Sequence, residues 1–162
     1  MPIKYFICFL CTLFVSLSSY ATCVGLGCSC SVSTAAFNFG TYDPLSSIND
    51  NTTGTVSVTC SALVINAIVN YNIELSPGSS GNYTARTLVD GINDLTYNFY
   101  IDASRSIIWG DGSSGTSLIN DGYLISLLAP VTRNYTIYGQ IPAEQAVTPG
   151  MYLDTVVATV VF

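Results

Sequence analysis

The sequence predicts an all-β fold, a small β-sandwich held together by disulfides. Apolar and polar residues alternate with a period of two in several short segments, and no segment has convincing helical periodicity. Turn-forming residues separate these segments, for example at 43–44, 51–54, 76–81 and 148–150. An even number of cysteines remains after the expected export signal, as in many exported domains. Short strands with regular turn signals are typical of a sandwich or barrel.

Residues 1–21 have the pattern of a signal peptide. Lys4 precedes an apolar stretch, residues 5–17, which has the length of a signal-peptide core and is too short to span a bilayer. Ser19 and Ala21 are small residues of the kind that signal peptidase recognises, so we expect cleavage after Ala21. The expected mature chain, residues 22–162, has the length of one domain and contains no further apolar run as long as a membrane helix.

The strands follow from the alternation. Inward-facing positions are expected in four segments, and the apolar run 123–129 is expected to be a buried strand. Residues 151–162 are rich in β-branched side chains and are expected to form one long last strand. Because its edge is uncharged and no later strand covers it, we expect a partner to add a strand there. The expected inward residues of the four segments are Val56, Val58 and Cys60; Val69, Tyr71, Ile73 and Leu75; Leu95, Tyr97, Phe99 and Ile101; and Tyr135, Ile137 and Gly139.

The charge of the chain excludes one class of partner. Once Lys4 is removed, Arg86, Arg105 and Arg133 are the only cations against ten carboxylates. Nucleic-acid binding needs clustered lysine and arginine, so it is not expected. We expect the three arginines to pair with nearby aspartates on the surface.

Four cysteines remain after the expected cleavage: Cys23, Cys28, Cys30 and Cys60. Three pairings are possible, and we favour Cys30–Cys60, which joins two expected strands, with Cys23–Cys28 as the second bond. A zinc site is a weaker hypothesis, because the chain has no histidine and Cys60 is isolated.

The residue types argue against an enzyme. Absence of histidine removes the common nucleophile–base pairs, and Glu74 and Glu144 belong to no apparent carboxylate pair. No catalytic residue, cofactor or metal is therefore predicted. Trp109, next to an Asp-Gly turn, could be a sugar platform or, with Asp102, part of a calcium loop. A tryptophan that covers one end of the core is the favoured interpretation.

Several motifs, in order and at similar spacing, resemble the spore coat protein U domain family. They cover about residues 28–162, and the family includes pilins of the archaic chaperone–usher pili. The motifs are Phe37-Asn38-Phe39-Gly40-Thr41-Tyr42-Asp43-Pro44, Gly54-Thr55-Val56-Ser57-Val58-Thr59-Cys60, Tyr97-Asn98-Phe99-Tyr100, Ile108-Trp109-Gly110-Asp111-Gly112, Tyr138-Gly139-Gln140-Ile141-Pro142 and Pro149-Gly150-Met151-Tyr152-Leu153-Asp154-Thr155.

The resemblance implies an immunoglobulin-like β-sandwich that lacks its last strand. A periplasmic chaperone would hold such a subunit, an outer-membrane usher would assemble it, and a neighbouring pilus subunit would complete it with a donor strand. The family's disulfide would map onto Cys30 and Cys60. The implied role is adhesion or biofilm formation at the cell surface, in a pilus or in the extracellular matrix. The implied donor-strand groove lies between residues 31–40 and the inward side of the last strand: Val156, Ala158, Val160 and Phe162.

One departure from the family concerns the N-terminus. Only residues 22–29 separate the expected cleavage site from Cys30, and two of these eight are cysteines. This segment predicts a subunit that accepts a strand but hardly donates one, in a terminal, minor or non-polymeric role. The alternatives are a self-contained carbohydrate- or protein-binding module of the envelope or matrix and, less favoured, a small secreted hydrolase.

Overall fold

The computed structural model describes residues 22–126 and 128–162, so the expected signal peptide lies outside the described residues. Within these ranges the chain forms nine β-strands and no helix, and therefore no helix long and apolar enough to cross a membrane. The strands are β1 Thr22–Val24, β2 Ser29–Thr34, β3 Asp50–Ser61, β4 Ala67–Leu75, β5 Arg86–Asp90, β6 Asn93–Tyr100, β7 Ile119–Ile125, β8 Val131–Ile141 and β9 Ala158–Val161.

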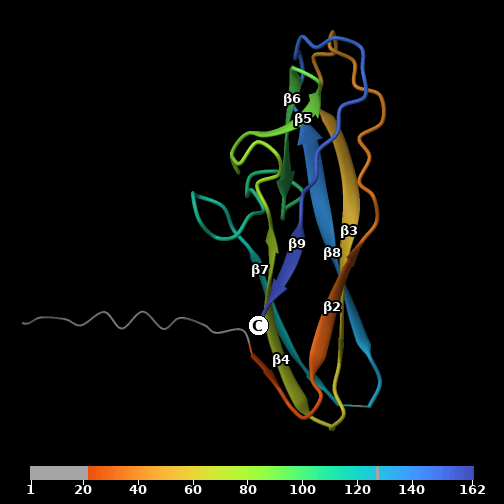
Figure 1. Cartoon of the computed structure of the whole chain (residues 1–162), viewed down its shortest axis with the longest axis vertical. Helices are drawn as coiled ribbons and strands as arrows, with labels where there is room; N and C mark the ends of the chain where they lie inside the picture. Colours follow the sequence, from red (N-terminus) through yellow and green to blue (C-terminus); the bar gives the residue numbers. More distant parts are fainter. Residues whose placement is uncertain (1–21, 127) are drawn as a thin grey trace, which may run out of the picture.

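The strands form two antiparallel sheets that face each other (Figure 1). The five-stranded sheet has the order β2-β3-β8-β6-β5, and in the four-stranded sheet β4 pairs with β7 on one edge and with β1 and β9 on the other. The two long strands β3 and β8 pair along eleven consecutive registers, from Asp50–Ile141 to Cys60–Val131. The two sheets confirm the all-β sandwich predicted from the alternation, and two disulfides, described below, confirm that it is cross-linked.

The core lies between the sheets and contains the expected inward residues. Val69, Tyr71, Ile73 and Leu75 of β4 are buried, as are three apolar residues of β6. The indole of Trp109 is also fully buried, and its Nε1 donates a hydrogen bond to the carbonyl of Ile73 at 2.9 Å. Trp109 is thus a core residue, as favoured. The described part of the chain contains no group of His, Cys, Asp or Glu side chains that could hold a metal ion.

The expected single strand over residues 151–162 is wrong. Leu153 forms an isolated bridge with Val89 of the five-stranded sheet, whereas β9 pairs with β4 of the four-stranded sheet. The segment therefore crosses from one sheet to the other, and only its last part forms a strand. The apolar run 123–129 is likewise not one buried strand, because β7 ends at Ile125 and Leu128 is exposed.

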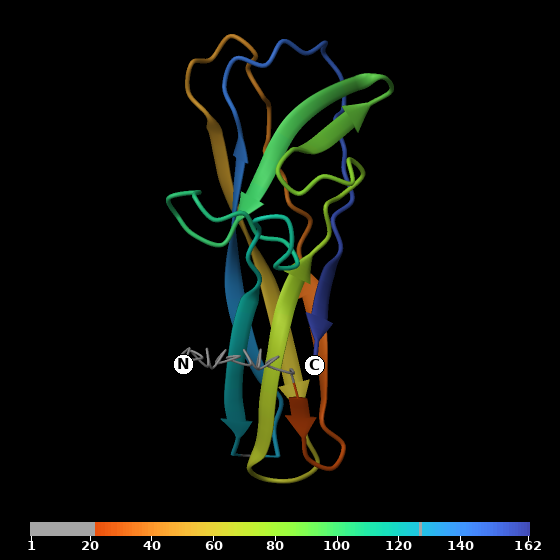
Figure 2. The ribbon, with the colours of Figure 1, turned by 90° about the vertical axis from the view of Figure 1, so that its left-hand side faces the viewer.

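β9 and β1 lie one after the other on the same edge of β4 (Figure 2). Val161 of β9 is opposite Asn72, and Thr22 of β1 is opposite Asn70. Both strands run antiparallel to β4, so only Tyr71 separates the two paired stretches. The β4 edge is therefore covered by the first and the last strand of the described residues.

Candidate functional site

A cavity of about 260 Å³ lies between the segment that follows β2 and the segment that leads into β9. The first segment follows β2 of the five-stranded sheet and the second leads into β9 of the four-stranded sheet, so the cavity lies on one side of the sandwich, between the two sheets. Outside the strand ladders, residues 35–39 form no backbone–backbone hydrogen bond in the described part of the chain. The cavity is lined by Thr34, Ala35, Ala36, Phe37, Phe39, Leu75, Leu88, Tyr97, Phe99, Ile137, Asp154, Thr155, Val156 and Ala158.

Aromatic rings form one wall and the floor of this cavity. The ring of Phe37 contacts that of Phe99 edge to face, with centroids 4.7 Å apart, and that of Phe39 at 5.1 Å. Phe37 also lies directly on the backbone of Gly54 in β3 and Gly139 in β8. A methyl group at either glycine would approach the Phe37 ring to 2.5 Å. These two glycines therefore create the space that seats the aromatic wall.

The opposite wall contains two of the four groove residues expected from the sequence. Val156 and Ala158 line the cavity. Val160 is half-buried and packs on the core, but it lies beyond the cavity lining. Phe162, which was expected to face inward, is 44% exposed at the end of the chain. Inward alternation thus holds from Tyr152 to Val160 and fails at the last residue, which lies beyond the β9–β4 pairing.

Asp154 is the one charged residue that lines the cavity. Its Oδ1 accepts hydrogen bonds from the backbone N–H of Ser79 at 2.8 Å and from the Ser79 hydroxyl at 2.6 Å. Its Oδ2 accepts a bond from the Tyr97 hydroxyl at 2.7 Å. Burial raises the pKa of Asp154, but the bonds from Ser79 and Tyr97 outweigh this effect and hold the pKa below its usual value. Asp154 is therefore a fixed anchor for the wall that carries Val156.

Arg86, expected at the surface in an ion pair, is fully buried next to this site. Its guanidinium donates to the carbonyl of Ser76, to the carbonyl of Trp109 at 2.8 Å and to Oδ1 of Asn98 at 2.6 Å. Burial lowers the pKa of Arg86. Arg105 likewise bonds to carbonyls, those of Gly139 and Ala103. The expectation of surface pairs is therefore wrong for these two arginines, which satisfy main-chain acceptors instead.

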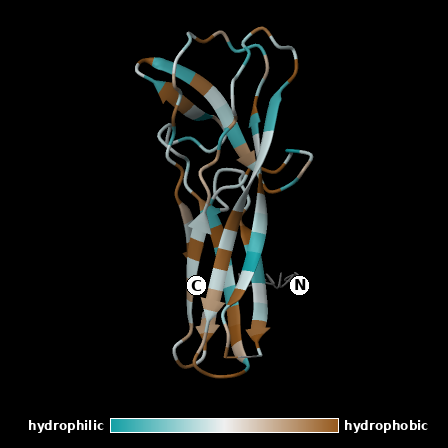
Figure 3. Cartoon of the chain, turned by 90° about the vertical axis from the view of Figure 1, so that its right-hand side faces the viewer, coloured by the Kyte–Doolittle hydropathy of each residue, from teal (hydrophilic) through white to brown (hydrophobic). Residues whose placement is uncertain are grey.

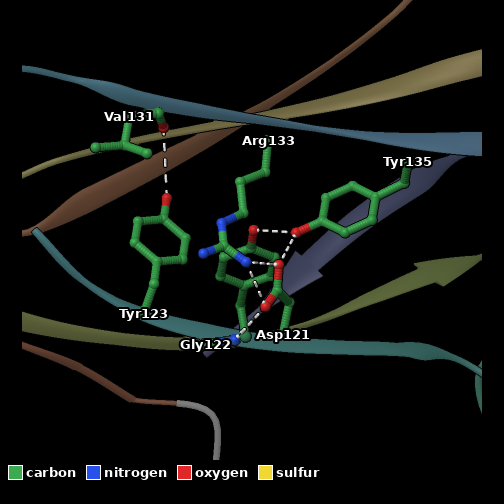
Figure 4. Close-up of polar contacts among 7 residues, drawn as sticks. Asp121, Gly122, Tyr123, Val131, Arg133 and Tyr135 are labelled. Atoms are coloured by element: carbon green, nitrogen blue, oxygen red, sulfur yellow. Dashed lines mark hydrogen bonds and ion pairs between the residues drawn. The ribbon is translucent and has the colours of Figure 1, made fainter.

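The other side of the sandwich, between β7 and β8, is closed by a polar network (Figure 4). Arg133 of β8 pairs with Asp121 of β7, as expected, with Nη1 at 2.9 Å from both carboxylate oxygens. The hydroxyl of Tyr135 also donates to Asp121 and shares a 2.5 Å hydrogen bond with that of Tyr71. The Arg133 guanidinium lies 4.3 Å from the ring centroid of Tyr123. Side chains thus bridge the sheets here, whereas the side at Phe37 and Val156 contains the cavity.

Comparison with known proteins identifies the family. The family model described as the spore coat protein U domain matches residues 14–159. The chain belongs to the spore coat protein U domain family. "Protein U" of Myxococcus xanthus is 36% identical over 150 residues, which are 85% of this chain and 79% of that protein.

A solved structure shares the fold of this spore coat protein U domain. It is the chaperone–tip adhesion subunit pre-assembly complex CsuC–CsuE from archaic chaperone–usher Csu pili of Acinetobacter baumannii. One of its chains superposes with a TM-score of 0.56 at 20% sequence identity. The match covers 83% of this chain and 40% of that one, so this chain spans less than half of its structural neighbour's length.

Two disulfides lie toward one end of this spore coat protein U domain. Cys30 of β2 and Cys60 of β3 are direct register partners and are bonded to each other. Cys23 and Cys28 are bonded across the β1–β2 turn. All four cysteines are therefore bonded in pairs, and a disulfide sulfur is not the thiolate that a zinc site would need.

The same end of the domain, the lower end in Figure 3, is apolar and uncharged. Three hairpin turns meet there: β1–β2, β3–β4 and β7–β8 (Figure 2). Residues 22–32, 57–68 and 122–132 contain no charged side chain. Sequence reasoning missed this surface, since the topology was needed to bring the three turns together. We call it the apolar pole; its exposed large side chains are Val24, Leu26, Leu63, Ile65, Ile68, Leu124 and Leu128.

Proposed function

We propose that this chain is an exported surface or pilus subunit, assembled by a chaperone–usher pathway and completed by a donor strand from a neighbouring subunit. The observation that carries the proposal is the cavity between residues 34–39 and 154–158. It lies between a segment that follows β2 of the five-stranded sheet and a segment that leads into β9 of the four-stranded sheet, and most of its lining side chains are apolar. An extended peptide could fill such a site. Its alternate side chains would enter the core, and its backbone would form hydrogen bonds with the two bordering segments.

The proposed partners follow from this mechanism. A periplasmic chaperone would occupy the groove first, an outer-membrane usher would exchange it, and a neighbouring subunit would supply the final strand. Support comes from the family membership and from the fold shared with a subunit–chaperone complex. The expected signal peptide fits export through the periplasm to the cell surface, a pilus or the extracellular matrix.

The proposed role of the assembled subunit is adhesion or biofilm formation. The apolar pole supports it, because soluble monomers rarely gather so many exposed large aliphatic side chains in one region. The pole carries neither the cations that an anionic surface would require nor exposed aromatic platforms for sugars. An apolar surface is the target that fits these side chains.

A binding experiment with the exported, oxidised chain tests strand acceptance. Peptides of alternating apolar residues are added, and the shift of the thermal unfolding midpoint is measured. A peptide that fills the cavity binds only the folded state, so the midpoint should rise by several degrees. Val156→Asp should abolish the shift because it places a charge in the cavity wall. Thr159→Lys, on the outward face of β9, is the matched control and should retain it.

The opposite result would favour the self-contained module. In that case the chain alone would be monomeric, would unfold cooperatively at high temperature and would give the same midpoint with every peptide. Binding of carbohydrate or protein ligands would then be the function to test.

A further inference from the structure

Two sheet edges face each other on the side of the sandwich that the polar network closes. Within residues 22–126 and 128–162, β7 pairs with β4 alone, so its second edge has no strand neighbour there. In the same ranges, residues 131–137 of β8 pair with β3 alone, because β6 reaches β8 only at 138–140. Unpaired backbone groups along such edges are a template for a further strand. This side is therefore a second place at which a strand could be added.

Asp121 is the one charged residue of β7, which spans Ile119–Ile125. Without this carboxylate, the strand would be an uncharged edge of the kind that pairs readily with another strand. Asp121 is the register partner of Tyr71, whose side chain is fully buried, so both side chains lie on the inward face of the sheet. An inward-pointing charge on an edge strand is one of the devices by which natural sheets resist strand addition.

The network around Asp121 also occupies backbone groups of both edges (Figure 4). The N–H of Gly122 donates to Oδ1 of Asp121 at 2.7 Å, and the hydroxyl of Tyr123 donates to the carbonyl of Val131 in β8 at 3.4 Å. The side chain of Asp121 is 20% exposed and that of its ion-pair partner Arg133 is 42% exposed. A strand laid along β7 would cover this pair and remove its remaining water, which is unfavourable for charged groups.

We propose that Asp121 is a gate residue, whose carboxylate prevents a second copy of the chain from pairing its own β7 with this edge. Two copies of β7 would otherwise pair antiparallel through the same edge, as a two-fold axis allows. The inference deepens the proposed function, because it makes strand addition one-sided. The side at Phe37 and Val156 remains able to accept a strand, whereas the side at Asp121 is closed to one.

Self-association of the exported, oxidised chain tests the gate. The parent and every variant carry Val156→Asp, which closes the cavity to strands in the proposed mechanism, and sedimentation is measured over a range of concentrations. Asp121→Ala should form a dimer roughly tenfold tighter than any association of the parent. Asp121→Asn, which keeps the side-chain volume, should shift the equilibrium in the same direction. Asp94→Ala removes the same charge from an exposed position beside the β5–β6 turn and should leave the association unchanged.

A matched pair of lysine substitutions locates the contact. Leu124 of β7 and Ile68 of β4 are register partners, and both side chains are exposed. In the Asp121→Ala chain, Leu124→Lys should abolish the dimer, because two paired β7 edges would bring like charges together. Ile68→Lys lies one strand further from the contact and should retain the dimer. Loss of the dimer in both lysine variants would assign the association to the apolar pole and overturn the inference.

The remaining outcomes separate the gate from the proposed function. Unchanged self-association in both Asp121 variants would overturn the inference, whatever the cavity binds. Strand acceptance is measured separately, as the shift of the unfolding midpoint that a donor peptide causes in the Asp121→Ala chain with Val156 intact. A retained shift supports the proposed function even if the dimer is absent. Absence of the shift in this chain and in the unaltered chain would overturn the proposed function, and with it the one-sided strand addition.

Discussion

The hydroxyl of Tyr97 in β6 donates a 2.7 Å hydrogen bond to Oδ2 of Asp154, which joins the five-stranded sheet to the segment that crosses to β9. Removing this bond in Tyr97→Phe leaves a half-buried carboxylate oxygen without its donor. We expect the free energy of unfolding to fall by about 1–3 kcal/mol in urea titrations. Tyr138→Phe is the control, since its hydroxyl forms no hydrogen bond within residues 22–126 and 128–162. Equal losses in both variants would contradict the anchoring role of Asp154.

Replacement of Arg86 should be more damaging. Arg86→Met retains much of the side-chain volume but leaves the carbonyl of Trp109 and the amide oxygen of Asn98 without their buried donor. We expect a loss of about 2–4 kcal/mol, measured from the midpoint of chemical denaturation. Arg105→Met, where the arginine is partly exposed, should cost clearly less. A surface-like effect below about 0.5 kcal/mol for Arg86→Met would show that the buried hydrogen bonds are dispensable.

Stability should decrease in acid. Burial raises the pKa of Asp121 and of Asp154, but hydrogen bonds from Tyr135 and Arg133, and from Ser79 and Tyr97, hold both values below normal. A carboxyl with a lowered pKa in the folded state stabilises the fold above its unfolded pKa, about 3.9. That contribution is lost as the pH falls through the folded value. The unfolding free energy should therefore drop below about pH 4, and an Asp121→Asn/Asp154→Asn double variant should show a weaker acid dependence. An identical pH profile would refute this assignment.

The two disulfides should differ in their contribution to stability. Cys30–Cys60 has a sequence separation of 30, and Cys23–Cys28 of 5. Chain entropy then predicts a loss of about 3–4 kcal/mol for a Cys30→Ala/Cys60→Ala variant and about 2 kcal/mol for Cys23→Ala/Cys28→Ala. Differential scanning calorimetry of the exported variants checks the order. A larger effect at the short loop would mean that β1 contributes to the fold mainly through its contacts on β4.

The apolar pole should control adsorption to apolar surfaces. Leu63→Ser and Leu128→Ser remove exposed side chains from neighbouring turns, so the stability should change by no more than about 0.5 kcal/mol. Adsorption to alkyl-coated beads should fall severalfold in the double variant, because the contact is apolar area alone. Ile92→Ser is the matched control, since Ile92 is 98% exposed in the β5–β6 turn at the opposite end. Equal losses at both ends would show that adsorption is nonspecific.

The period-two pattern was sufficient to predict β4 and β6, because their inward residues face one core. The same pattern concealed the change of sheet at Leu153. Inward positions continue without a break through Tyr152, Asp154, Val156, Ala158 and Val160, since both sheet edges face the same interior. Alternation records which face is buried and carries no information about the pairing partner.

The groove was located from the sequence only in part. Val156 and Ala158 follow from alternation, whereas the aromatic wall depends on how Phe37 lies on Gly54 and Gly139, which are distant in the chain. The burial of Arg86 was not predicted because its acceptors include the main-chain carbonyls of Ser76 and Trp109. Every residue has a main-chain carbonyl, so the residue types do not reveal these acceptors. The hydrogen-bond partners of a buried cation become visible only when the loops are placed.

The position of Thr22 directly beyond Val161 and Phe162 on the β4 edge makes this fold suited to circular permutation. Continuing the β9 register past Phe162 by one residue reaches Asn70, which is where Thr22 already lies. A peptide bond from Phe162 to Thr22 would thus turn two short terminal strands into one uninterrupted strand without inserted residues. New ends could be opened in the β5–β6 turn at Gly91-Ile92, far from the groove-facing side of β9, and the permuted chain should retain both sheets.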